Sequence, residues 1–99
     1  MILELAQLTI RPGDEARFEA AFPAAGKILG AAKGYVSLEL KRSVETPNRY
    51  ALLVHWQTLE DHIVGFRESP AFKEWRALIG PYFGSPPLVE HFQTIANAA

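Results

Sequence analysis

Residues 35–57 read YVSLELKRSVETPNRYALLVHWQ, which is two extended segments on either side of a turn. Apolar and polar side chains alternate in residues 35–44, which indicates a strand with one wetter face. Residues 49–57 are apolar at most positions, so the second strand is predicted to be apolar on both faces. Residues 45–48, ETPN, are typical of a turn, and so short a connection predicts an antiparallel hairpin.

A helix is predicted before this hairpin. Its apolar face follows from Phe18, Phe22, Ala25 and Leu29, which recur at helical spacing. Pro12-Gly13 turns the chain before it, and Asp14 is predicted to cap the first turn. Pro23 lacks a backbone donor, so we expect a kink or break near residues 20–22. Gly30 and Gly34 are predicted to stop the helix.

A second helical region is predicted after the hairpin. Thr58 with Asp61 approximates a capping box, and Ser69-Pro70 restarts the helix, with Ser69 as N-cap and Pro70 at its first position. The side chains predicted to point inward are Leu59, His62, Ile63, Phe66, Phe72, Trp75, Leu78 and Ile79.

Two further strands, residues 2–10 and 88–95, complete the order β-α-β-β-α-β. This order predicts one α+β, ferredoxin-like domain over residues 1–99, with a four-stranded antiparallel sheet and both helices on one face. Two strands of that sheet, residues 2–10 and 49–57, are apolar on both faces. Because the helices cover only one face, we expect the other face to pack against a second copy of the chain, which gives a homodimer.

Composition narrows the classes of function. The ten basic and eleven acidic residues are scattered singly, which argues against a nucleic-acid surface. The absence of cysteine excludes disulfides, thiolate metal sites and a cysteine nucleophile. Residues 1–10 do not resemble a signal peptide, and no apolar run approaches the ~20 residues that span a bilayer. A soluble, cytoplasmic protein without membrane contacts is therefore expected.

Four segments carry a family resemblance: RPGDEARFEAAF (11–22), VHWQTLEDH (54–62), FRESPAF (66–72) and PLVEHF (87–92). In this order and at this length the chain resembles the antibiotic biosynthesis monooxygenase domain family. The resemblance implies a dimeric α+β barrel with a small-molecule pocket between helices and sheet. It also implies, for some members, cofactor-independent oxidation of anthrone-type molecules by O2 to quinones. Other members degrade haem.

The haem-degrading branch is disfavoured by three positions. It uses an asparagine on the first strand, then a tryptophan and an iron-ligating histidine in the second helical region. Aligned on the Pro-Gly turn and on FRESPAF, this chain has Ala6, Phe66 and Arg76 at those positions. An arginine keeps its proton and its charge, so it cannot be the proximal iron ligand.

Three residues are candidates for catalysis. His62 could be a general base, because an imidazole with a pKa near 6.5 can deprotonate a phenolic or carbon acid, and the resulting anion can pass an electron to O2. His91 is the alternative base. Trp56 could stack on a flat substrate. Each of the three also has a structural reading, as a core or rim side chain.

Four residues are candidates for substrate binding: Phe66, Phe72, Arg76 and Tyr82. Arg76 could hold an anionic oxygen or lie on the surface, and Tyr82 could orient a hydroxyl or cover the core. A metal site is not predicted, because His55 points to the opposite strand face from Trp56 and no histidine pair has the four-residue helical spacing. No nucleotide-binding motif is present, so no cofactor is predicted.

The predicted function is therefore cofactor-independent oxidation of a small phenolic, anthrone or quinone-type molecule. The alternative is a non-catalytic dimeric module that binds a small hydrophobic ligand, since every residue named also has a packing explanation.

Overall fold

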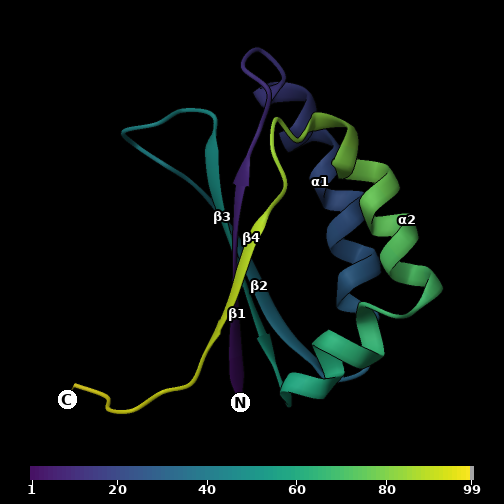
Figure 1. The fold of residues 1–99 in the computed structure, drawn as a ribbon, viewed down its shortest axis with the longest axis vertical. Coiled ribbons are helices and arrows are strands. Elements are labelled where there is room, and N and C mark those ends of the chain that lie inside the picture. Colours follow the sequence, from purple (N-terminus) through teal and green to yellow (C-terminus); the bar gives the residue numbers. More distant parts are fainter. Residues whose placement is uncertain (99) are drawn as a thin grey trace.

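The computed structural model describes residues 1–98 and contains one four-stranded antiparallel sheet with the helices on a single face (Figure 1). The elements are β1 (Ile2–Thr9), α1 (Glu15–Gly30), β2 (Tyr35–Arg42), β3 (Arg49–Trp56), the π-helical turn η1 (Asp61–Phe66), α2 (Pro70–Ile79), the 3₁₀ turn η2 (Gly80–Tyr82) and β4 (Leu88–Phe92). The strand order β2-β3-β1-β4 confirms the predicted ferredoxin-like arrangement. No helix within residues 1–98 has the length and apolar character needed to cross a membrane.

The inner face of the sheet carries the core. β1 pairs with β3 so that Ala6 lies opposite Leu52 and Leu8 lies opposite Tyr50, and all four side chains are buried. The apolar side chains of α1 pack on these four residues. Its apolar face, Phe18, Phe22, Ala25 and Leu29, is buried as the spacing indicated.

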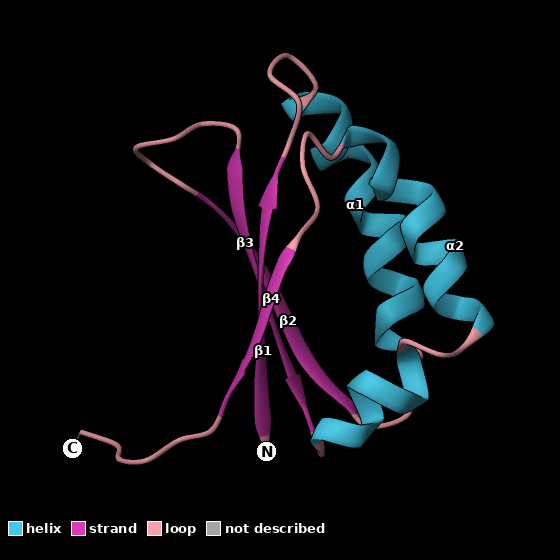
Figure 2. Ribbon diagram, in the orientation of Figure 1, coloured by secondary structure: helices cyan, strands magenta, loops and turns pink. Residues whose placement is uncertain are grey.

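The outer face of the sheet has no helix over it (Figure 2). Leu5 lies opposite Leu53 there, and both are half-buried. On β4, Leu88 and Phe92 share this face with exposed fractions of 67% and 43%. The outer face therefore carries a row of apolar side chains along β1, β3 and β4, together with the polar Gln7, His55 and Glu90.

α1 corrects two expectations. The helix continues through Pro23 without a break. Phe22 and Ala25 on either side of it are buried against the core, and this packing outweighs the cost of ~3 kcal/mol for an interior proline. Asp14 does not cap the helix with its side chain. Its carboxylate accepts a hydrogen bond from Arg17 at 2.6 Å instead.

The second helical region differs in three details. Pro70 begins α2 and Ser69 stands at the N-cap position as predicted, but the Ser69 side chain makes no capping hydrogen bond, because its hydroxyl donates to the Phe66 carbonyl at 2.6 Å. The prediction that Leu78 points inward is wrong, since Leu78 is 37% exposed while Ile79 beside it is fully buried. The turn that follows Trp56 is π-helical, which the sequence did not predict.

The two edge strands, β2 and β4, are shorter than predicted. β4 ends at Phe92, which pairs with Leu3 next to the first residue of β1. β2 ends at Arg42, after which the Ser43 N–H donates to the Arg49 carbonyl and closes the hairpin loop.

Candidate active site

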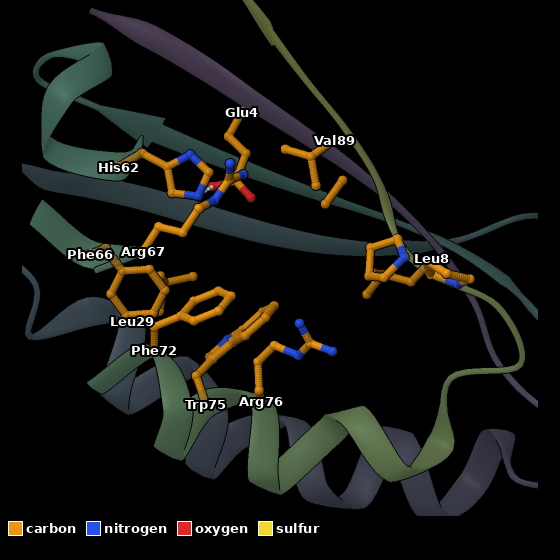
Figure 3. Close-up of a pocket in the computed structure, with 13 residues that line it drawn as sticks. Glu4, Leu8, Leu29, His62, Phe66, Arg67, Phe72, Trp75, Arg76 and Val89 are labelled. Carbon is orange, nitrogen blue, oxygen red and sulfur yellow. Dashed lines mark ion pairs between the residues drawn. The ribbon is translucent and has the colours of Figure 1, made fainter. Parts of the chain in front are cut away.

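A cavity of about 380 Å³ lies between the inner face of the sheet and the second helical region (Figure 3). Its walls are mainly apolar. β1 and β4 contribute Leu8 and Val89, and α2 contributes Phe72 and Trp75 from the opposite side. Phe66 of η1 packs on both aromatic rings of α2, with ring centroids 5.7 and 6.3 Å away. The cavity therefore offers flat, apolar surfaces of the kind that small-molecule sites use.

One end of the cavity is polar. Glu4 enters it from β1, His62 from η1 and Arg67 from the residue that follows η1 (Figure 3). Glu4 faces inward because it shares a strand face with Ala6, and only 5% of its surface is exposed. His62 is buried to a similar extent, with 3% exposed. A carboxyl and an imidazole are thus held together away from bulk water.

These two side chains are tied to two neighbours. The Trp56 indole N–H donates to Glu4 Oε1 at 3.0 Å, and His62 Nε2 lies 3.2 Å from the same oxygen. His62 Nδ1 lies 2.7 Å from His91 Nε2 on β4. The His62 ring stacks on Trp56, with centroids 5.2 Å apart and planes 20° apart. His62 is therefore fixed by a ring face and by contacts at both nitrogens.

Burial shifts the pKa values in this cluster. It lowers the pKa of His62 to about 4, and the nearby Arg67 and His91 act in the same direction. Burial is also the main cause that lowers the pKa of His91. Burial raises the pKa of Glu4, although the Trp56 hydrogen bond and Arg67 oppose this rise. At neutral pH His62 is neutral, so its contact with Glu4 is not a salt bridge.

The π-helical turn sets the position of His62. The Arg67 N–H donates to the His62 carbonyl at 2.9 Å, five residues back, so this turn holds one more residue than an α-helical turn. Upstream, Thr58 Oγ1 accepts the Asp61 N–H at 3.2 Å, which is half of the predicted capping box. π-turns are rare and frequently occur at functional sites.

The predicted substrate-binding residues divide into two groups. Phe66, Phe72 and Arg76 line the cavity, as His62 does. Arg76 lies over the Phe72 ring, 5.9 Å from its centroid. Tyr82 lies in η2 and packs against the core, outside the set that lines the cavity.

Two predicted catalytic residues stand behind the cavity wall. Trp56 is fully buried, and the His62 ring covers its face where a substrate was expected to stack. Its N–H donates to Glu4, so it does not face a ligand either. His91 does not line the cavity, but it contacts His62 directly. Both residues join the site through His62 and Glu4.

Sequence reasoning missed Glu4 and Arg67. The available signal for Glu4 was a single charged residue in register with Ala6, Leu8 and Ile10 on the apolar face of β1. Arg67 gave no signal, because it directly follows a helical turn whose π geometry the periodicity does not reveal.

His55 lies apart from the other two histidines, which contact each other. His55 lies on the outer sheet face, where its Nδ1 is 3.3 Å from Ser37 Oγ. Within residues 1–98 no group of three or more histidine, aspartate or glutamate side chains is arranged to hold a metal ion. The positions compared with the haem-degrading branch, Ala6, Phe66 and Arg76, all line the cavity.

Comparisons with known proteins agree with this fold. Residues 1–78 match the family described as antibiotic biosynthesis monooxygenase. The chain is 44% identical over 95 residues to the uncharacterized protein YczJ of Bacillus subtilis (strain 168), covering 96% of this chain and 100% of that one.

Two solved structures are similar along nearly the whole chain. One, from Bordetella bronchiseptica and assigned to the antibiotic biosynthesis monooxygenases, is 43% identical with a TM-score of 0.93, covering 96% of this chain and 97% of the other. The other is a variant of SnoaB, a cofactor-independent oxygenase from Streptomyces nogalater. It is 17% identical with a TM-score of 0.82, covers 97% and 94%, and shares the fold alone. By the family match over residues 1–78 and the identity to both close relatives, the chain belongs to the antibiotic biosynthesis monooxygenase family.

Proposed function

We propose that this protein is a cofactor-independent monooxygenase that oxidises a small phenolic, anthrone or hydroquinone-type molecule with O2. The observation that carries the proposal is the Glu4–His62–His91 cluster, in which Glu4 and His62 are buried, at one end of an aromatic cavity. Family membership supports the reaction class, as does the description of SnoaB as a cofactor-independent oxygenase.

The cluster supplies what such a reaction needs first, which is a proton acceptor next to an apolar binding surface. For an anthrone, loss of one C–H proton gives an electron-rich carbanion that passes one electron to O2. The two radicals combine to a peroxide on the same carbon. Loss of the second hydrogen from that carbon and cleavage of the O–O bond leave one oxygen as the new carbonyl and release the other as water. The substrate is oxidised, O2 is reduced, and no external reductant is required.

The test is oxygen uptake with a panel of anthrones, hydroquinones and flavonols. Replacing His62 with alanine removes a side chain that contacts Glu4, Trp56 and His91, so uptake should fall by ~10²-fold or more. Glu74→Ala is the control because Glu74 is exposed on α2 and does not line the cavity, and it should retain the wild-type rate. An unchanged rate in His62→Ala would remove His62 from the mechanism.

A second candidate is a non-catalytic module that binds a small hydrophobic ligand. One observation favours it: both ring nitrogens of His62 already contact protein atoms, as they would in a purely structural cluster. In the same panel, binding without oxygen uptake by any member would support this candidate and contradict the first.

We also propose that the chain forms a homodimer through the outer sheet face. Support comes from the half-buried Leu5 and Leu53 and the exposed Phe92, which leave that face apolar with no helix over it. A cytoplasmic location and the absence of a cofactor stay predictions from the sequence.

A further inference from the structure

We infer that Glu4, rather than His62, accepts the proton of the substrate, and that His62 and Trp56 are positioning residues which hold the Glu4 carboxylate. This inference rests on the proposed function and names the group that performs its first step.

Both ring nitrogens of His62 already contact protein atoms. A neutral imidazole has one N–H and one lone pair. In the proposed resting state Glu4 is ionised and only accepts hydrogen bonds, so His62 Nε2, which lies 3.2 Å from Glu4 Oε1, carries the hydrogen. The lone pair is then on Nδ1, which lies 2.7 Å from His91 Nε2 and accepts a hydrogen bond from it. Neither nitrogen of His62 is left to take a proton from a substrate.

The two oxygens of the Glu4 carboxylate differ in their contacts. Oε1 is held by the Trp56 N–H at 3.0 Å and by His62 Nε2. Oε2 has no hydrogen-bond partner among residues 1–98, and Glu4 lines the cavity. One oxygen is therefore fixed by two donors, while the other is the unengaged acceptor at the polar end of the binding space.

The surroundings of the Glu4 carboxylate favour uptake of a proton. Burial raises the pKa of Glu4 above its usual value, so its ionised form is a stronger base than an exposed glutamate. The apolar rings of Phe66 and Phe72 line the same cavity and would hold an aromatic ring beside it. A carbon or phenolic acid bound there meets a carboxylate with little water to compete for the proton.

The proton balance is closed within the same site. Glu4 Oε2 takes one proton as the substrate anion forms. The protonated Glu4 returns it to the reduced oxygen when the O–O bond breaks and water leaves, so Glu4 is ionised again at the end of the cycle. No relay to the surface is required, and His62 keeps its tautomer throughout.

The test measures deprotonation directly, without O2. An anthrone is mixed with protein under anaerobic conditions, and its carbanion is followed by absorbance while binding is measured separately by isothermal titration calorimetry. Glu4→Gln keeps the side-chain volume and an acceptor for Trp56, so we expect carbanion formation to slow by ~10²-fold or more with affinity within a few-fold of wild type. His62→Gln should slow it by about tenfold, because the amide can still donate to the carboxylate but cannot also stack on Trp56 and accept from His91 as the imidazole does. Glu74→Gln, an exposed carboxylate on α2, is the matched control and should match wild type.

Wild-type carbanion formation in Glu4→Gln would overturn the inference. So would its loss in His62→Gln together with its retention in Glu4→Gln, which would make His62 the base.

A second measurement needs no substrate and separates this inference from the proposed function. Nitrogen-15 NMR of the His62 ring at pH 8 should show a protonated Nε2 and an unprotonated Nδ1, with the Glu4 carboxyl carbon at an ionised shift. An unprotonated Nε2 would overturn the assignment even if an anthrone is oxidised. The expected tautomer in a protein that oxidises no panel member would uphold the geometry while contradicting the proposed function.

Discussion

Folding buries the His62 ring against Trp56, Glu4 and His91. This burial makes the free energy of unfolding depend on pH. The pKa of His62 is about 4 in the folded chain, against 6.5 as the ordinary value. Between these two pH values the unfolded chain binds more protons, so the free energy of unfolding falls as the pH is lowered from about 6.5 to about 4. The contribution is fully present above pH 6.5, and its size is about 3 kcal/mol. Urea denaturation across this range measures it.

His62→Gln isolates this effect. The lowered pKa of His91 acts in the same direction as that of His62, whereas the raised pKa of Glu4 acts in the opposite one. The variant should therefore lose most of the decline in stability between pH 6.5 and pH 4. His55→Gln should keep the wild-type decline. Equal slopes in wild type and His62→Gln would show that His62 titrates normally in the folded chain.

At the residue scale the sequence predicted the aromatic and imidazole members of the site better than the carboxylate. His62, Phe66 and Phe72 stood out because their types and helical spacing are visible in a single segment. Glu4 lies more than fifty residues from His62 in the chain, and their contact exists only after β1 pairs with its neighbours. Local patterns do not encode which distant side chains share one end of a cavity.

Gly34 joins three elements, and this role gives a prediction at the element scale. It precedes β2 with φ of +83°, its carbonyl accepts the Gln57 N–H at 2.8 Å after β3, and it contacts Asp61 at the start of η1. A Cβ at this position would lie 2.6 Å from the Asp61 Cβ. Gly34→Ala should therefore lower the free energy of unfolding by at least ~2 kcal/mol more than backbone strain alone, as measured by urea denaturation.

Gly13→Ala is the matched control. Gly13 also has a positive φ, +96°, but a Cβ there would meet nothing within 4 Å. Only the backbone cost remains, which is ~1 kcal/mol. Equal losses in the two variants would contradict the steric role assigned to the contact between Gly34 and Asp61.

Element types were predictable because their signals are periodic and local. The strand period of two and the helical faces of α1 and α2 were visible without the fold. Element ends were not, since β4 stops at Phe92, which pairs with Leu3 one residue from the start of β1, and this pairing is not visible in the local pattern. The helix-breaking effect of Pro23 was overestimated, because helix propensity was considered without the packing of Phe22 and Ala25 in the core.

At the scale of the whole molecule, the outer sheet face predicts association. Leu53 lies at its centre, opposite Leu5 on β1. We expect sedimentation velocity at micromolar concentration to show two chains for the wild type. Leu53→Asp should sediment as one chain, because a dimer would bury an unpaired charge. A stable single chain in the wild type would contradict the proposed dimer.

Val44→Asp is the control for this prediction. It introduces the same charge in the loop between β2 and β3, where Val44 is 89% exposed. This variant should remain a dimer and keep the wild-type stability. Dissociation of both variants would assign the effect to net charge rather than to the outer face.

The overall arrangement was predictable because the order of six elements leaves few compact antiparallel solutions. The cavity was not, since its shape depends on how Phe66, Phe72 and Trp75 pack against each other and on the sheet. The resemblance indicated where a pocket would lie. Only the side-chain positions showed that its polar end holds a carboxylate.

The π-helical turn at Asp61–Phe66 also affects how relatives should be aligned. A turn closed five residues back accommodates one residue more than a regular α-helical turn, as an insertion would. A homologue with a regular helix at this place would need a one-residue gap between the counterparts of Trp56 and Arg67. Without that gap, the column that holds His62 would contain a neighbouring residue, and a shared histidine would be scored as a substitution.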